Sequence, residues 1–184
     1  MAGTAGEKIV LGSGKLYTTE FTGEIPNDAT IEAEGNLLGL IQGGATLEYK
    51  PTFYEAEDDL GIKKKVILTK EEVTFKSGIM TWNGKTLKKL SSTAIVTEAS
   101  GKRTVKIGGI GKQDGKKHIL RFVHEDKVDG DIKVTIVGTN QAGFSLAFQK
   151  DKETVIDAEY KAQPLDTEGT LIIYEEEIPE AQQG

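Results

Sequence analysis

Short runs of β-branched and aromatic residues, separated by turn-forming residues, recur along most of this 184-residue chain. Runs of this length, with apolar and polar side chains in alternation, are typical of strands in an all-β fold. The predicted strands are residues 16–21, 45–50, 66–69, 73–80, 105–107, 118–124, 132–137, 144–148, 155–160 and 170–174. A strong hairpin signal, Asp129-Gly130, separates two of these runs. We therefore expect a mainly β protein.

One helix is predicted among these strands, over about residues 84–93. Asn83 can cap its first turn. Leu87, Leu90 and Ala94 follow at a spacing that places them on one helical face. The complete pattern indicates a two-sheet β-sandwich or barrel with this one helix lying against it.

Two other segments could begin helices. Residues 69–72 match a capping box, but the residues after them alternate with a period of two, so we expect a strand there. Residues 25–36 fit either a helical turn or a loop.

Length and composition indicate one domain over residues 1–184, large enough to bury roughly 70% of its unfolded surface. The two ends, about residues 1–8 and 175–184, lack a strand pattern and are expected to be flexible arms. The chain contains no cysteine, which excludes disulfides and thiolate sites. Its start does not resemble a secretory signal, and no apolar run is long enough to cross a bilayer, so we expect synthesis in the cytoplasm without membrane anchoring.

The net charge of −6 and the pI near 5.1 argue against tight binding of nucleic acid. Such binding depends on lysine and arginine side chains that neutralise phosphates and release counterions. The small basic clusters, such as residues 63–65, are expected to be solvated surface.

No segment carries a convincing catalytic or metal-binding pattern. His118 and His124 on one strand would lie about 20 Å apart, so we expect surface or edge positions rather than a shared metal ion. The glycine-rich residues 12–14 and 108–111 do not lead from a strand into a helix, as a phosphate-binding loop would. The acidic residues 55–59 lack the ligand spacing of a calcium loop.

No serine lies in a nucleophile elbow, and sequence alone cannot set the separation of a carboxylate pair. We therefore expect no catalytic residue, no cofactor and no metal, and a protein that is not an enzyme.

The most informative local feature is an exposed loop predicted over about residues 51–62. A strand ends there at a proline, two adjacent aromatics and four carboxylates follow, and strand resumes near Val66. The aromatic pair either folds back onto its own sheet or anchors a contact with another subunit, with the acids as a polar rim. The candidate contact residues are Lys50, Pro51, Thr52, Phe53, Tyr54, Glu55, Ala56, Glu57, Asp58, Asp59 and Leu60.

Several segments of the chain together resemble the major tail tube proteins of long-tailed bacteriophages, especially those that infect Gram-positive hosts. These segments are residues 41–51, 78–87, 122–138 and 144–160. The resemblance implies the tail tube type of β-sandwich or barrel, which is shared with the tubes of type VI secretion and of contractile tails.

The same resemblance implies a structural subunit that assembles into stacked hexameric rings, which form the conduit for DNA ejection into the host. The loop at 51–62 would contact the next ring, and the terminal arms would order on assembly. Its partners would be other copies of itself, the tape measure, the tail terminator and the tail tip or baseplate, with DNA passing transiently. The protein would be located in the tail of the virion after synthesis in the host bacterial cytoplasm.

Elementary physics fits this function. Strand edges with unpaired backbone groups are satisfied when neighbours join edge to edge around a ring. An acidic wall would let DNA slide.

Two other functions stay open. One is a carbohydrate- or surface-binding β-sandwich module from a tail tip or an adhesin, and the other is a hydrolase with an acidic site. Trp82 is the only tryptophan available to stack on a sugar, and no acid–base pair is defined.

Overall fold

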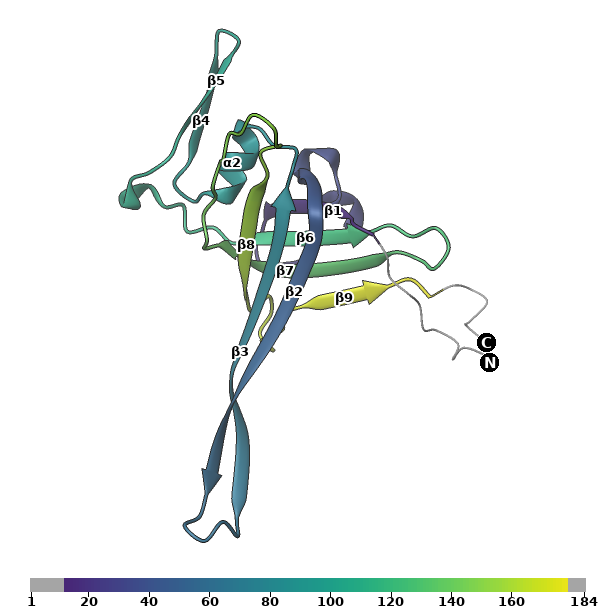
Figure 1. The fold of residues 1–184 in the computed structure, drawn as a ribbon, viewed down its shortest axis with the longest axis vertical. Helices are drawn as coiled ribbons and strands as arrows, with labels where there is room; N and C mark the ends of the chain where they lie inside the picture. The colour runs from purple at the N-terminus through teal and green to yellow at the C-terminus, as the bar shows by residue number, and fades with distance from the viewer. Residues whose placement is uncertain (1–11, 179–184) are drawn as a thin grey trace.

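The computed structural model describes residues 12–178, and nine strands make up most of the regular structure in that range (Figure 1). The strands are β1 (Lys15–Glu20), β2 (Leu37–Glu57), β3 (Lys64–Ile79), β4 (Ile95–Ala99), β5 (Lys102–Lys106), β6 (His118–His124), β7 (Ile132–Asn140), β8 (Ile156–Gln163) and β9 (Ile173–Glu176). The helices are α1 (Asp28–Ile31) and α2 (Gly84–Leu90), and the 3-10 turns are η1 (Glu34–Asn36) and η2 (Ile110–Lys112). The prediction of a mainly β protein is confirmed.

Six of the strands close into a barrel. Their order is β6-β1-β2-β3-β8-β7, and β7 also pairs with β6, so the last strand meets the first. Every pairing is antiparallel. β9 pairs with the first half of β7, while β4 and β5 form a separate two-stranded hairpin.

The main hydrophobic core fills the inside of this barrel. It contains side chains from each of the six strands and from α2. Its buried members are Leu16, Leu38, Val73, Phe75, Ile79, Leu90, Leu120, Ile136, Ile156, Ala158 and Tyr160. Phe75 and Phe122 lie within it with their ring centroids 6.0 Å apart. Because alternate residues of a strand face opposite sides, their neighbours in sequence face outward.

A second apolar cluster lies on the outer face of β1, β6 and β7. Ile31 of α1 packs there against Tyr17, Ile119, Val123 and Val137. The short α1 therefore covers a part of the barrel that would otherwise be exposed.

A network of charges joins α1 to the same outer face. The Arg121 guanidinium, on β6, is almost completely buried and lies 2.7 Å from an Asp28 carboxylate oxygen and 3.1 Å from one of Glu32. Lys133 on β7 lies 2.7 and 2.9 Å from the same two carboxylates. These hydrogen bonds, those from Lys133 first, lower the pKa of Asp28.

The predicted helix is present but shorter than expected. Asn83 caps α2 by accepting a hydrogen bond from the Lys85 backbone N–H, and the Thr86 hydroxyl accepts one from the Asn83 backbone. The helix ends at Leu90 rather than near residue 93, because Ser91 adopts an extended conformation that starts the path to β4. Ala94 is buried, but it lies outside the helix.

Several strand predictions need correction. The runs predicted at 66–69 and 73–80 belong to one strand, β3, and the strand predicted at 45–50 is part of the much longer β2. Residues 144–148 alternate like a strand but form none, because no strand among the described residues pairs with them. An isolated bridge joins Gln149 to Lys152 just after this segment. The last strand runs over Ile173–Glu176 instead of residues 170–174, so it includes the first two residues of the expected C-terminal arm. β4 was not expected. Residues 25–36, left open between helix and loop, contain α1 and η1.

The expectation for the histidines is wrong in one case. Both lie on β6, but His124 is buried, and its Nδ1 lies 2.8 Å from the Ser13 carbonyl oxygen. His118 is half-buried, and desolvation lowers its pKa. The expected N-terminal arm, residues 1–8, and residues 179–184 of the C-terminal arm lie outside the described residues.

Candidate assembly surface

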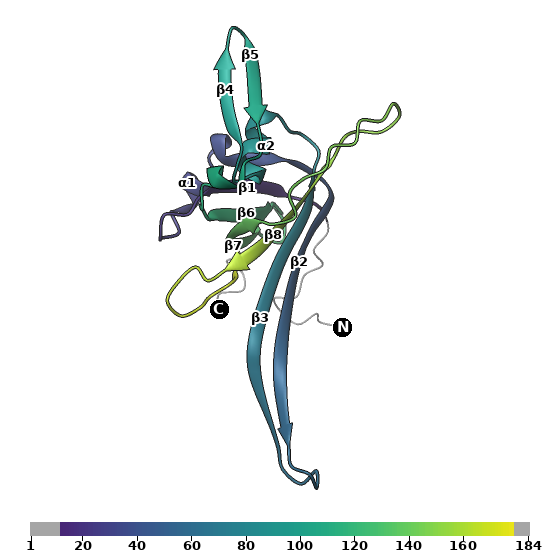
Figure 2. The ribbon, with the colours of Figure 1, turned by 90° about the vertical axis from the view of Figure 1, so that its left-hand side faces the viewer.

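The second and third strands of the barrel continue far beyond it as a two-stranded hairpin (Figures 1 and 2). Every residue from Tyr49 to Glu72 is exposed, and we call this segment the projecting hairpin. At about 3.3 Å per residue, β2 extends roughly 26 Å from Tyr49 to its end at Glu57. The hairpin is therefore a large surface over which none of residues 12–178 packs.

The loop predicted over residues 51–62 is mostly strand. Lys50 to Glu57, the first eight candidate contact residues, belong to β2 and pair with β3, and only Asp58, Asp59 and Leu60 lie in the turn. Pro51 does not end the strand. At this position β2 is an edge strand, because it pairs with β3 on one side only. A proline is tolerated on an edge strand, because its lack of an N–H costs no hydrogen bond on the open side.

The turn at the tip is organised by Asp58. One of its carboxylate oxygens accepts hydrogen bonds from the backbone N–H groups of Ile62 and Lys63, at 2.6 and 2.8 Å. Gly61, with φ +67°, donates its N–H to the Asp58 carbonyl and provides the left-handed backbone that the turn requires. Leu60 and Ile62 project from this turn into solvent.

One face of the projecting hairpin is apolar and continues the interior face of the barrel. Leu47 lies opposite Phe75 and Tyr49 opposite Val73, and both of these β3 partners are buried in the core. Cross-strand partners share a face, and alternate residues along β2 return to it. Beyond the barrel, this face therefore carries Pro51, Phe53, Val66 and Leu68. The same register places the charged residues Glu71, Glu55, Glu57 and Lys64 around them on this face.

A one-residue bulge in β3 keeps these side chains on the same face. Thr52 pairs with Lys70, but the next residue, Phe53, pairs with Leu68, so Thr69 has no partner of its own in β2. The Thr69 hydroxyl donates a hydrogen bond to the Thr52 carbonyl, 3.1 Å away. Val66 then lies opposite Glu55, on the same face as Phe53.

The opposite face of the hairpin is charged near the barrel. Lys50 pairs with Glu48 at 3.0 Å and Lys70 with Glu72 at 2.9 Å, and the hydrogen bond from Lys70 lowers the pKa of Glu72. Nearer the tip this face carries Tyr54 and Ile67. The two faces of the hairpin therefore differ most next to the barrel, and near the tip both carry apolar side chains.

Charged groups also lie on the apolar face. The Tyr49 hydroxyl donates to a Glu71 carboxylate oxygen at 2.8 Å, which raises the pKa of the tyrosine, and Lys64 lies 2.6 Å from Glu55. Exposed pairs of this kind contribute little stability. They place charge on both sides of the apolar group formed by Pro51, Phe53, Val66 and Leu68.

Both outer edges of the projecting hairpin are open among the described residues. β1 pairs with β2 only as far as Leu40, and β8 pairs with β3 only from Thr74 onward. The strands of the barrel itself have their edges satisfied by closure. The expectation that the body of the fold would leave open edges for its neighbours is thus wrong for the barrel, and open edges occur instead on the hairpin, on β9 and on the β4–β5 pair.

The exposed aromatics answer one question that the sequence left open. Phe53 and Tyr54 are 55% and 60% exposed, so they do not fold back onto their own sheet. Sequence reasoning missed the contribution of β3 to this surface, Val66 and Leu68. Period-two alternation from Leu47 through Phe53 could have indicated the apolar face of β2, but the bulge hid its counterpart in β3.

The described part of the chain contains no cluster of three or more His, Asp or Glu side chains that could hold a metal ion. Its helices are all too short or too polar to cross a membrane. Trp82, the only tryptophan, is partly buried against the core and donates its indole N–H to the Thr154 carbonyl at 3.0 Å.

Neither the comparison with protein-family models nor the comparison with curated proteins finds a match for this chain.

Proposed function

We propose that this protein is a structural subunit that assembles with copies of itself, and that the assembly is the tube of a bacteriophage tail. In this proposal hexameric rings stack into a conduit for DNA ejection, and the projecting hairpin makes the contact between one ring and the next. The chain acts by assembly, with no catalytic step.

The observation that carries the proposal is the apolar face of the projecting hairpin. A single two-stranded hairpin is marginally stable in water, and an exposed strand edge is a template for pairing with another chain. This hairpin has two open edges and an apolar face that continues from the core. Contiguous exposed apolar surface of this kind marks an interaction site.

The shape of the molecule supports a stacked assembly. The hairpin extends along the longest axis of the molecule, and the β4–β5 hairpin extends from the opposite end (Figures 1 and 2). The two ends are different, so copies arranged along this axis would meet head to tail. Contacts between unlike surfaces can repeat without limit, as a tube requires.

The carbohydrate-binding alternative has less support. A sugar platform needs an exposed aromatic ring, and the Trp82 indole is partly buried with its N–H already bonded. Phe148 stands beside it, with ring centroids 6.4 Å apart, and is exposed, but a single exposed phenylalanine is a weaker stacking platform than a free indole.

Electron microscopy of the purified protein tests the proposal. At high protein concentration, negatively stained samples should show rings or tubes. A variant in which Asn-Gly replaces residues 51–71 should keep the β-rich circular dichroism spectrum, because the core residues Val73 and Phe75 remain. It should form no stacked tubes.

A pair of matched variants on the same hairpin sharpens this test. Replacing both Phe53 and Leu68 with Asp places two charges on the apolar face, and replacing both Thr52 and Lys70 with Asp places them on the opposite face. Only the first should abolish tubes. A protein that stays monomeric at every salt concentration, even beside tail-initiation partners, would contradict the proposal.

A further inference from the structure

Charge is distributed very unevenly across the width of this molecule. We call residues 102–117, which run from β5 through η2 to β6, the basic flank; they contain six basic residues and one acid, Asp114. We call the β6–β7 loop, residues 125–131, together with residues 175–177 at the end of β9, the acidic edge; it contains seven acids and one base, Lys127.

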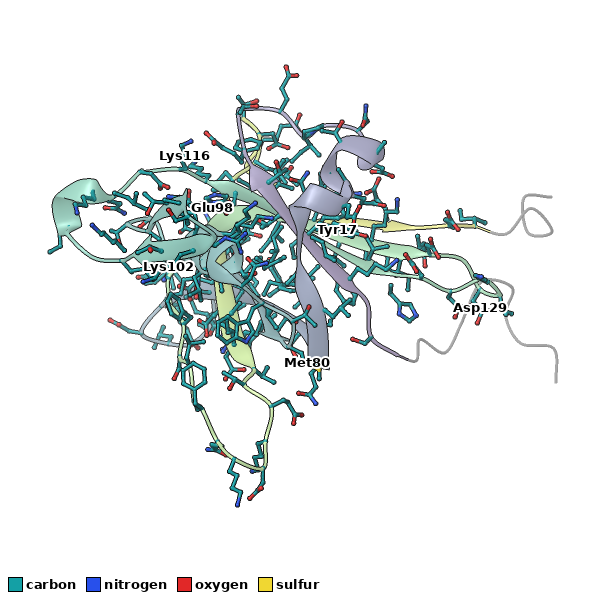
Figure 3. All side chains as sticks on the ribbon, turned by 90° about the horizontal axis from the view of Figure 1, so that it is seen from above. Tyr17, Met80, Glu98, Lys102, Lys116 and Asp129 are labelled. Atoms are coloured by element: carbon teal, nitrogen blue, oxygen red, sulfur yellow. The ribbon has the colours of Figure 1, made fainter. Side chains whose placement is uncertain are left out.

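These two surfaces lie on opposite sides of the barrel. In the view from above, Lys102 and Lys116 are at the left and Asp129 is at the far right (Figure 3). In Figure 1 the loop that contains η2 is at the left and the β6–β7 loop is at the right, so both views agree. This direction is perpendicular to the long axis along which the projecting hairpin extends.

Each surface has an exposed aliphatic side chain among its charges. Ile110 in η2 is 93% exposed, and Val128 in the β6–β7 loop is 85% exposed. An apolar centre with a charged surround is the usual arrangement of a specific protein interface. Each surface therefore has an aliphatic side chain surrounded by charged groups, and the charges of the two surfaces are opposite in sign.

The charges of the basic flank have few partners within their own chain. Lys102, Lys106, Lys112 and Lys117 are exposed, and none forms an ion pair with a described residue. On the acidic edge, the one contact of the Glu176 carboxylate with a described residue is a 3.4 Å hydrogen bond from the Tyr174 hydroxyl. An unpaired charge of each sign is thus available to an outside partner.

Both surfaces are held in place by backbone hydrogen bonds. In the acidic edge, Asp126 accepts from the Val128 N–H at 2.8 Å, and the Glu177 N–H donates to the Asp131 carbonyl at 3.0 Å. In the basic flank, the Asp114 N–H donates to the Ser92 carbonyl at 3.1 Å. Ordered surfaces lose less conformational entropy on binding.

We infer that the acidic edge of one copy binds the basic flank of a second copy, side by side, with Val128 and Ile110 at the centre of the contact. The contact joins unlike surfaces, so each copy keeps one of each kind for a further neighbour, and a rotation between copies closes the chain of contacts into a ring. This inference rests on the proposed self-assembly and names the surfaces that would join subunits within a ring, where the projecting hairpin would join rings.

Disulfide trapping tests the contact directly, because the chain has no cysteine of its own. An Ile110→Cys variant and a Val128→Cys variant, one carrying a size tag, are mixed and oxidised mildly. Mixed disulfides should exceed the two symmetric ones. A Glu34→Cys variant mixed with Val128→Cys is the matched control, since Glu34 is exposed in η1, outside both surfaces.

Charge reversal gives an independent measurement. Lys112→Glu with Lys117→Glu, or Glu125→Lys with Glu176→Lys, should each raise the protein concentration needed for assembly about tenfold or more, because repulsion across an interface disfavours it. All four changes in one chain should restore assembly. The exposed substitutions Lys150→Glu and Glu34→Lys should have no effect.

The outcomes separate this inference from the proposed function. If rings or tubes form, but mixed disulfides do not exceed the control and charge reversal has no effect, the inferred contact is wrong and the proposed function stands. If the wild-type protein never assembles under any condition, the proposed function fails and the inferred contact fails with it.

Discussion

The barrel and the projecting hairpin share strands β2 and β3, but these strands are surrounded by neighbours in the barrel and exposed in the hairpin. Inside the barrel, β2 and β3 have neighbours on both edges, and Phe75 and Val73 are buried. Past Tyr49, β2 and β3 pair only with each other among the described residues, and the same face presents Phe53 and Leu68 to water. One continuous ladder therefore supports a folded core at one end and an unsatisfied surface at the other.

This difference separates two properties that mutations usually affect together. Side chains in the barrel should determine whether a single copy folds, and side chains on the hairpin should determine whether copies associate. Four changes test how sharp this division is.

The largest effect is expected from truncating a ring in the core. Phe75→Ala should destabilise the free subunit by about 3–5 kcal/mol, because it removes a buried ring and leaves a cavity beside Phe122. Phe53→Ala, the same change on the hairpin, should alter stability by no more than about 0.5 kcal/mol. Urea unfolding measures the stability of each variant. Equal losses of stability would contradict the separation of folding in the barrel from association on the hairpin.

A smaller effect is expected from the cap of α2. Asn83→Ala should cost about 1 kcal/mol, since it removes the side chain that accepts from the Lys85 N–H. Thermal unfolding should show the loss, whereas tubes of the variant should form at the same protein concentration as those of the wild type. If Asn83→Ala impaired assembly without lowering the stability of the free subunit, α2 would contribute to the interface.

The pH dependence of stability should come from the barrel. The pKa of Asp28 is lowered below its ordinary value of 3.8 by hydrogen bonds from Lys133 and Arg121. Its carboxylate therefore stabilises the fold at pH values above the unfolded-state pKa, and this contribution is lost as the pH falls through the folded-state pKa. Because Asp28 is half exposed, the effect should be no more than about 1 kcal/mol.

Unfolding in urea at pH 3 and at pH 6 measures this contribution. Asp28→Asn should reduce the difference between the two stabilities, and Glu55→Gln on the hairpin should leave it unchanged. A larger change from Glu55→Gln would contradict the assignment.

The smallest effect is expected from an ion pair on the hairpin. Lys64→Ala removes the 2.6 Å contact with Glu55, and the stability of the free subunit should change by less than about 0.5 kcal/mol because both side chains are about half exposed. Chemical denaturation measures it. A loss above about 1 kcal/mol would show that the hairpin is tied to the fold more strongly than its exposure indicates.

Local chemistry made some parts of the fold predictable. Asn83 followed by an apolar stripe indicated α2, and the alternation over residues 118–124 with Asp129-Gly130 after it indicated the β6–β7 hairpin. Each signal depends only on residues close in sequence. The barrel closure depends on pairing of β6 with both β1 and β7, which no local pattern specifies.

The errors have the same origin. Pro51 and four nearby acids are typical of a loop, yet the strand continues because β3 supplies a ladder partner at each position. Residues 144–148 have the alternation of a strand, and Phe144 and Leu146 do pack on the core, but alternation selects a face and cannot supply a neighbouring strand. For the candidate surface, the sequence indicated β2 and missed β3.

The unpaired Thr69 determines which side chains of β3 share a face with Phe53. Counting alternate positions back from Val73 would put Leu68 and Val66 opposite Tyr54 and Ala56, on the charged side. The unmatched threonine advances the phase of β3 by one position and transfers both aliphatic side chains to join Phe53. A single extra peptide unit thus decides which aliphatic side chains of β3 share a face with Phe53, and it leaves Ile67 opposite Tyr54 on the other face.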